Sequence, residues 1–185
     1  MGAARRTELF DDLVTLLLDE GFAHLTLDDL AARLRCSKRT LYALAGSKEQ
    51  LVRSAVVHFF RGATERVEAS VTGEPAEQVG AYLRAVAREL STASAAFFDD
   101  VAAFPPAAEV YERNTRAAAR RVQQLVDAGV AGGAFRPVHA GFVGDVVSAA
   151  MVRIQRREVA EGTALEDAAA YEALADLLLH GLTRR

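Results

Sequence analysis

The sequence predicts an all-α protein of about nine helices, with a three-helix helix-turn-helix domain followed by a larger helical bundle. Apolar residues recur at helical spacing throughout the 185 residues, and no segment alternates apolar and polar residues as a half-buried strand would. Glycine and proline fall between the periodic segments, where these residues end helices. We expect domain boundaries at residues 1–50 and 51–185.

The first domain is expected to contain three helices. The first covers about residues 7–20 and ends at Gly21, which can adopt the left-handed backbone of a helix C-terminus. The second starts at Thr26, whose hydroxyl can accept a first-turn amide hydrogen, and Ser37 can do the same for a third, short helix. Two short helices in this arrangement are typical of a helix-turn-helix, whose second helix fits the major groove of DNA.

The remaining helices are expected to be longer. Ser47 and Gln50 have the spacing of a capping box at the start of a long helix that runs to Gly73. Five more helices are predicted at about residues 75–92, at 93–104, from Pro105-Pro106 to 128, at 139–161 and at 165–183.

Composition and charge narrow the possible functions. The net charge is −3, but both lysines of the chain, Lys38 and Lys48, fall within the helix-turn-helix region. The longest run without Asp, Glu, Lys or Arg is nine residues, 90–98, too short for a transmembrane helix. The single cysteine, Cys36, fits a reducing compartment. We therefore expect a cytoplasmic protein that does not bind membranes.

The first turn of the third helix gathers polar and basic residues. A helix N-terminus favours phosphate because its free amide hydrogens point outward. Arg39 could pair with a guanine edge through two hydrogen bonds, while a tyrosine hydroxyl and a lysine ammonium nearby could reach flanking phosphates. The candidate DNA-binding residues are Thr26, Ser37, Lys38, Arg39, Thr40, Tyr42 and Lys48.

The same segment resembles the TetR/AcrR family of transcriptional regulators. The resemblance covers roughly residues 7–55 and lies in three stretches: Thr26-Leu27-Asp28-Asp29-Leu30-Ala31, Cys36-Ser37-Lys38-Arg39-Thr40-Leu41-Tyr42 and Ser47-Lys48-Glu49-Gln50-Leu51. It implies that Thr26, Tyr42 and Lys48 contact phosphates. It also implies that Lys38, Arg39 and Thr40 face the groove.

Three positions depart from the family's pattern. Arg35 stands where the family often has glycine, so either it adopts a left-handed backbone at a cost of about 1 kcal/mol or the turn differs. Ala45 replaces an aromatic residue and Cys36 an aliphatic one. A buried cysteine usually behaves as a small hydrophobe, although a redox-sensing role is the alternative for Cys36.

Large apolar and aromatic side chains are concentrated outside the DNA-binding helices. Each could be ordinary core, but as a set they could line a cavity between helices, where bundles bind ligands. The resemblance implies a small-molecule effector, for which we expect an apolar or aromatic compound; Asn114 and Thr115 could add polar contacts. The candidate ligand-binding residues are Phe59, Tyr82, Phe97, Phe98, Phe104, Tyr111, Asn114 and Met151.

The last two predicted helices are suited to dimerisation. One has a smooth surface of small residues and the other an apolar leucine stripe, which the core or a partner must cover. Similar proteins pair these helices across a two-fold axis, which predicts a homodimer on a near-palindromic operator. The candidate interface residues are Gly141, Gly144, Ser148, Leu174 and Leu178.

Two other classes of function remain as alternatives. A helical scaffold that has lost operator binding would be consistent with Arg35 and Ala45. A helical-bundle enzyme would need acid, base or metal ligands on facing helices, yet the four histidines lack ligand-like spacing and no catalytic motif is present. We therefore expect a repressor released by its ligand, with no catalytic residues, no metal site and no cofactor.

Overall fold

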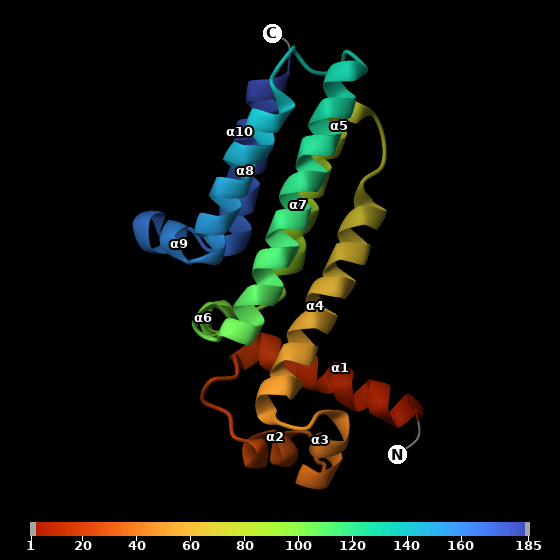
Figure 1. The fold of residues 1–185 in the computed structure, drawn as a ribbon, viewed down its shortest axis with the longest axis vertical. Coiled ribbons are helices and arrows are strands. Elements are labelled where there is room, and N and C mark those ends of the chain that lie inside the picture. The colour runs from red at the N-terminus through yellow and green to blue at the C-terminus, as the bar shows by residue number, and fades with distance from the viewer. Residues whose placement is uncertain (1–2, 184–185) are drawn as a thin grey trace. The chain divides into compact units, whose positions relative to one another are not determined.

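The computed structural model describes residues 3–183, and all of its regular elements are helices (Figure 1). This confirms the predicted all-α class. The ten helices of this part of the chain are α1 (Ala3–Glu20), α2 (Leu27–Arg33), α3 (Lys38–Leu44), α4 (Lys48–Ser70), α5 (Pro75–Leu90), α6 (Ala95–Ala103), α7 (Pro105–Ala131), α8 (Ala140–Gln155), α9 (Glu158–Thr163) and α10 (Asp167–Leu182).

The helix count differs from the prediction because the helix expected at residues 139–161 is divided. Arg157 has a left-handed backbone (φ 63°), which ends α8 and starts α9. Its guanidinium pairs with Asp167 and Glu166, so a tertiary ion pair holds the break in place. The long α4 also ends at Ser70, before Gly73, and the Ser70 hydroxyl donates to the Val67 carbonyl at 2.7 Å.

The chain forms two compact units. Unit 1 contains residues 3–61 and 92–110, and unit 2 contains residues 62–91 and 111–183. Unit 1 therefore joins α6 to α1, α2 and α3, although some fifty residues of sequence separate α6 from α3. The predicted boundary between residues 50 and 51 separates two functions and not two compact units, and it stays a prediction.

Unit 1 has an aromatic core. Phe97 of α6 makes edge-to-face contacts with Phe22, Phe59 and Phe98, with ring centroids 5.4 to 6.2 Å apart. Such pairs add to the stability that burial itself provides. The α1–α2 loop is fixed on α6 because the Asp100 carboxylate accepts the backbone N–H groups of Phe22 and Ala23.

Gly21 makes this attachment possible. It has φ +77°, and a Cβ at this position would lie 2.6 Å from an Asp100 carboxylate oxygen. The predicted left-handed end of α1 is thus confirmed. The structure adds a second reason for glycine, because the backbone here must approach α6 closely.

Unit 2 is a bundle in which α10 packs mainly on α5, with α7 and α8 beside them (Figure 1). Close approach depends on small residues: a Cβ on Gly80 would lie 2.6 Å from Leu179 Cδ1, and one on Gly144 would lie 2.9 Å from Gln123 Cβ. Among the helices of residues 3–183, none combines the length and apolar character needed to cross a bilayer.

Candidate nucleic-acid interface

The N-terminus of α2 is fixed by a reciprocal capping box. The Thr26 hydroxyl accepts the Asp29 N–H at 3.2 Å, while the Thr26 N–H donates to the Asp29 carboxylate at 2.8 Å. Hydrogen bonds from the Thr26 side chain and backbone hold the pKa of Asp29 below its usual value. Thr26 is solvent-exposed, so its position is set before any partner binds.

The turn between α2 and α3 contains the expected left-handed residue. Arg35 has φ 49°, and the following Cys36 N–H donates to the Ala31 carbonyl at 2.9 Å. Of the two alternatives for Arg35, the left-handed backbone is the one observed, and the turn forms without glycine. Cys36 is only half-buried rather than buried, and partial burial raises the pKa of its thiol.

The first turn of α3 presents its polar residues to solvent. The Ser37 hydroxyl accepts the Thr40 N–H at 3.1 Å and lies 2.8 Å from the Thr40 hydroxyl. Leu41 is buried and anchors the helix, whereas Lys38 and Arg39 are exposed. Tyr42 is 51% exposed, so it is not a core aromatic of this domain.

The basic residues of this region differ in their partners. Lys38 Nζ lies 2.7 Å from the Asp28 carboxylate, which raises the lysine pKa. Lys48 Nζ donates to the Ala23 carbonyl at 3.4 Å. Arg39 has no ion pair with any residue between 3 and 183. Its charge is therefore free for an anionic partner, while that of Lys38 is partly neutralised.

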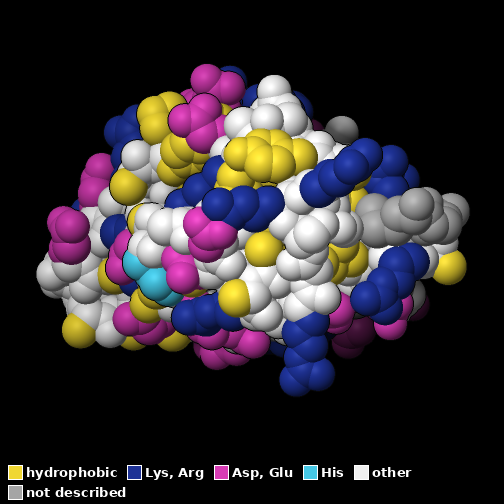
Figure 2. Space-filling model, turned by 90° about the horizontal axis from the view of Figure 1, so that it is seen from below, with side chains coloured by type: hydrophobic (Ala, Val, Ile, Leu, Met, Phe, Trp, Pro, Cys, Tyr) yellow, Lys and Arg dark blue, Asp and Glu magenta, His cyan; other side chains and the backbone are white. Residues whose placement is uncertain are grey.

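The Lys38–Asp28 pair did not follow from sequence reasoning. The sequence feature that could have pointed to Asp28 is its place in the first turn of α2, where a carboxylate complements the helix dipole. Seen from the end where α2 and α3 lie, Lys and Arg side chains are spread across the surface, with acidic residues interspersed (Figure 2). The charge of this end is thus patterned rather than uniformly basic, in keeping with the chain's net charge of −3.

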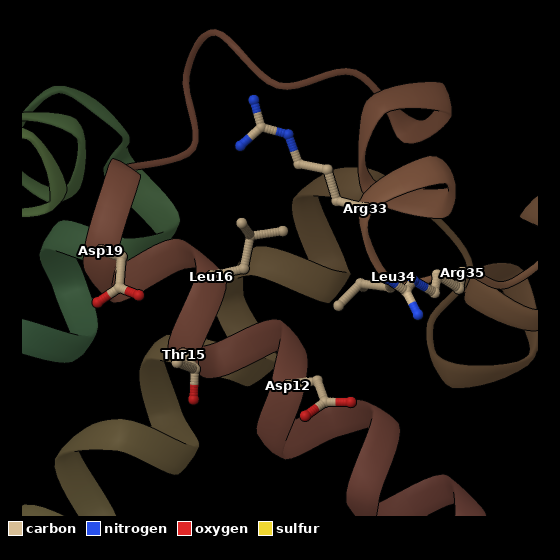
Figure 3. A pocket seen from close by; sticks show the side chains of 7 residues that line it. All are labelled: Asp12, Thr15, Leu16, Asp19, Arg33, Leu34 and Arg35. Atoms are coloured by element: carbon tan, nitrogen blue, oxygen red, sulfur yellow. The ribbon is translucent and has the colours of Figure 1, made fainter.

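A surface groove lies between α1 and the α2–α3 turn (Figure 3). Acidic Asp12 and Asp19 on α1 lie along one side and Arg33 and Arg35 along the other. Arg33 also pairs with Glu20. The groove carries charges of both signs, so it has no preference for an anion.

The predicted ligand-binding residues are distributed over both units. Most are buried, and Asn114 is half-buried and accepts a hydrogen bond from the Thr64 hydroxyl at 3.1 Å. The four phenylalanines, Phe59, Phe97, Phe98 and Phe104, belong to unit 1, and Tyr82, Tyr111, Asn114 and Met151 belong to unit 2. Sequence periodicity identified these residues as inward-facing but did not indicate this division.

The predicted dimer residues differ in exposure. Gly144 and Leu174 are buried within the single chain, Gly144 against Gln123 of α7. Gly141, Ser148 and Leu178 are partly exposed. The same two helices carry three exposed large apolar side chains. Leu177 belongs to the predicted leucine stripe, whereas Phe142 and Val146 were not predicted.

The described residues contain no group of three or more His, Cys, Asp or Glu side chains placed to hold a metal ion. The exposed groups around α3 are instead hydroxyls, the Arg39 guanidinium and backbone amides at a helix N-terminus, groups that can bind phosphate and base edges. The geometry therefore fits nucleic-acid binding.

Comparison with known proteins agrees with this geometry. Residues 9–55 match the family model described as bacterial regulatory proteins, tetR family. A search of the curated proteins gave no match. A TetR/AcrR-family regulator from Thermobifida fusca shares the fold at 26% identity and a TM-score of 0.69, with 98% of this chain and 100% of that chain covered.

Two further structures share the fold at lower identity. The TetR-family regulator PfmR from Thermus thermophilus has 21% identity and a TM-score of 0.66 over 95% of this chain and 99% of that chain. A transcriptional regulator from Saccharomonospora viridis, solved in complex with choline, has 16% identity and a TM-score of 0.77 over 100% of both chains. Residues 9–55 therefore match the N-terminal domain of the tetR family of bacterial regulatory proteins, and the chain as a whole shares the fold of solved TetR/AcrR-family regulators.

Proposed function

We propose that the protein is a homodimeric repressor that leaves a near-palindromic operator when a small molecule binds to it. The observation that carries the proposal is the first turn of α3, which is capped by Ser37, anchored by buried Leu41 and otherwise exposed. A helix fixed in this way can enter the major groove with little loss of side-chain or backbone freedom.

The roles of the individual residues follow from their partners. Arg39, with its charge free, reads a base edge. Tyr42, Lys48 and Thr26 contact phosphates on either side and fix the register, while Ser37 and Thr40 complete the helix end. Lys38 exchanges Asp28 for a phosphate, which is feasible because exposed ion pairs are weak.

A second copy of the chain is the proposed partner of α8 and α10. Phe142 is 65% exposed and Leu177 is 71% exposed, and Val146 lies one turn from Phe142. Exposed apolar side chains of this size favour an interface. Gly141, Ser148 and Leu178 would lie within or beside it, whereas Gly144 and Leu174 would support it from inside the chain.

The effector is proposed to bind within unit 2, which contains the predicted ligand-binding residues Tyr82, Tyr111, Asn114 and Met151. The continuity of α4 from unit 1 into unit 2 supports a response in which the ligand favours one tilt of this helix. Operator affinity would then fall only by the ligand's differential affinity for the two states. The choline complex of the Saccharomonospora viridis protein shows that one chain of this fold holds a small molecule.

The DNA-binding roles are tested by fluorescence anisotropy with the promoter of the protein's own gene, over a range of salt concentrations. Affinity should fall steeply as salt rises, since phosphate contacts release counterions. Tyr42→Ala and Lys48→Ala should weaken binding to all sequences, whereas Arg39→Ala should relax sequence preference. Arg120→Ala, an exposed arginine on α7, removes the same charge elsewhere and should have little effect.

The outcomes separate this function from its alternatives. Equal losses from all three variants would contradict the assigned roles. No binding to any neighbouring promoter would favour the scaffold alternative. For the dimer, Phe142→Glu and Leu177→Glu should give monomers in sedimentation velocity, whereas Leu165→Glu, outside α8 and α10, should not. Dimers that persist in both variants would place the interface elsewhere.

A further inference from the structure

The interior of unit 2 contains a group of polar side chains that the DNA-binding and dimer surfaces do not use. We call it the polar core of unit 2. It consists of Tyr82, Tyr111, Thr115, Gln155, Arg157, Asp167 and Tyr171. The three residues classed as buried and polar or charged within residues 3–183, Thr115, Gln155 and Asp167, all belong to it.

Part of the polar core satisfies its own hydrogen bonds. Asp167 is paired with the guanidinium of Arg157, so the two charges cancel. The Tyr111 hydroxyl lies 3.5 Å from the Asp167 carboxylate, and Tyr171 is hydrogen-bonded to Tyr111. Burial raises the pKa of both tyrosines, so each keeps its proton at neutral pH. This part therefore resembles an ordinary structural network.

Two atoms of the polar core are left unpaired. Thr115 Oγ1 and Gln155 Oε1 have no hydrogen-bond partner among the described residues, although the residues are only 1% and 9% exposed. A buried polar atom without a partner costs about 1–3 kcal/mol. Few buried side-chain polar atoms in native proteins lack a partner. Two such atoms in one bundle need a specific reason.

Helix geometry brings these two atoms to the same end of the bundle. Thr115 lies one turn from Tyr111 on α7, and Tyr111 reaches Asp167 at the start of α10. Gln155 lies two residues before Arg157, which also reaches Asp167. Gly144 of α8 lies against Gln123 of α7, and the two helices are antiparallel (Figure 1). The C-terminal end of α8, with Gln155, therefore lies beside the N-terminal half of α7, with Thr115.

We propose that Thr115 and Gln155 form the hydrogen-bonding end of the effector site and that the effector is a neutral molecule with a hydroxyl group. This inference rests on the proposed response to an effector. Gln155 Oε1 can only accept a hydrogen bond, so the ligand must donate one. The Thr115 hydroxyl can donate in return. The Arg157 guanidinium is already paired with both Asp167 and Glu166, so an anionic ligand would find no available cation there and would be buried without a counterion.

The rest of the ligand is expected to be apolar. Met151 is buried one turn before Gln155 on the same helix, and the rings of Tyr82, Tyr111 and Tyr171 are buried in the same unit. A thioether and aromatic rings favour an aromatic or cyclic body. The sequence-based expectation of an apolar or aromatic ligand is thereby narrowed to a phenol or a cyclic alcohol.

The test uses phenol and cyclohexanol on the full-length protein without DNA. Each is compared with its methyl ether, which keeps the shape but cannot donate, and with benzoate, which adds a charge. Binding is measured by isothermal titration calorimetry and by the shift in Tm. We expect at least one alcohol to bind and to raise Tm, whereas the ethers and benzoate do not. Binding of neither alcohol, or equal binding of alcohol and ether, would overturn the inference.

Two variants separate a ligand-binding role from a structural one. Thr115→Val and Gln155→Met remove the unpaired atoms but keep the volume, so neither should lower Tm. Each should weaken alcohol binding about tenfold or more, the equivalent of one hydrogen bond. Thr72→Val, at an exposed threonine, is the control. A lower Tm with unchanged alcohol binding would mean that internal water satisfies these atoms, and would refute the proposal.

The same samples separate failure of this inference from failure of the proposed function. Loss of operator binding in the wild-type protein, with alcohol binding intact, would contradict the repressor proposal alone. Operator binding without any alcohol binding would overturn the effector assignment alone.

Discussion

The two units are built from the same secondary structure but differ in the chemistry of their interiors. In unit 1 the centre is a cluster of phenylalanines, and no residue classed as buried and polar or charged belongs to its described part. In unit 2 the centre contains buried tyrosines, an ion pair and two unpaired oxygens. The stability of an apolar interior depends on how closely its side chains pack. The stability of a polar interior depends on each polar group having a hydrogen-bond or ion-pair partner.

This contrast suggests a division of labour. Unit 1 must hold α3 in one position, and close-packed aromatic rings give a rigid support. Unit 2 gives up stability at Thr115 and Gln155 and gains the ability to recognise a polar group. The following predictions test the contrast, from the largest expected effect to the smallest.

Phe97→Ala should destabilise the protein by about 3–5 kcal/mol, because it removes a buried ring that contacts three other rings. The free energy of unfolding from urea denaturation provides the measurement. Val57→Ala, at an exposed position of the same unit, should change it by less than about 0.5 kcal/mol. A small effect of Phe97→Ala would mean that the aromatic cluster is not the support of unit 1.

Asp167→Ala should cost about 3 kcal/mol, because it leaves the largely buried Arg157 guanidinium without its main partner. The double variant Arg157→Met/Asp167→Leu should cost less than Asp167→Ala alone, since it leaves no unpaired charge. Urea denaturation of both variants gives the comparison. If the double variant were as unstable as the single one, packing rather than pairing would govern the interior of unit 2.

Asp100→Ala should cost about 2 kcal/mol, since the backbone N–H groups of Phe22 and Ala23 lose a charged acceptor. Hydrogen exchange of these two amides should become faster, because the α1–α2 loop is no longer fixed on α6. Asp127→Ala, at an exposed carboxylate on α7, is the control. Unchanged exchange at both amides would show that aromatic packing alone attaches α6.

Thr26→Ala should cost about 1 kcal/mol through loss of the α2 N-cap. Thr72→Ala, at an exposed threonine that caps no helix, should have no measurable effect in the same thermal denaturation experiment. An equal shift in Tm for both would mean that the capping box does not stabilise α2 in the folded protein.

The smallest expected effect concerns the pH dependence of stability. The pKa of Asp29 is lowered below 3.8 by its hydrogen bonds with Thr26. The stability that Asp29 provides is therefore complete above the unfolded value and is lost as pH falls through its folded pKa. Asp29→Asn should flatten the stability curve below about pH 4, where the unfolded carboxyl titrates. An unchanged curve would contradict the role of the Asp29 carboxylate.

Local interactions explain which features could be predicted from the sequence. The caps at Thr26 and Ser37 join groups three residues apart, so they depend only on neighbours in the chain. The left-handed backbone at Arg35 was one of two alternatives implied by the family resemblance, since Arg35 stands at the turn position where the family often has glycine. Periodicity identified the inward-facing side chains because one face of each helix is buried.

Interactions between helices explain what could not be predicted. Periodicity shows that Gly144 and Leu174 lie on an apolar face but does not show whether this face meets the same chain or a second copy. The Lys38–Asp28 pair joins two helices, and the Arg157–Asp167 pair divides a segment that local pattern treats as one helix.

The sequence by itself therefore determined the helical class, the helix-turn-helix and the exposed residues of α3, since each depends on spacing within a few turns of chain. Only the tertiary structure decided that α6 belongs with the DNA-binding helices and that the polar core of unit 2 leaves Thr115 and Gln155 unpaired. Whether a buried polar atom has a partner depends on neighbouring helices, and helical periodicity carries no information about those neighbours.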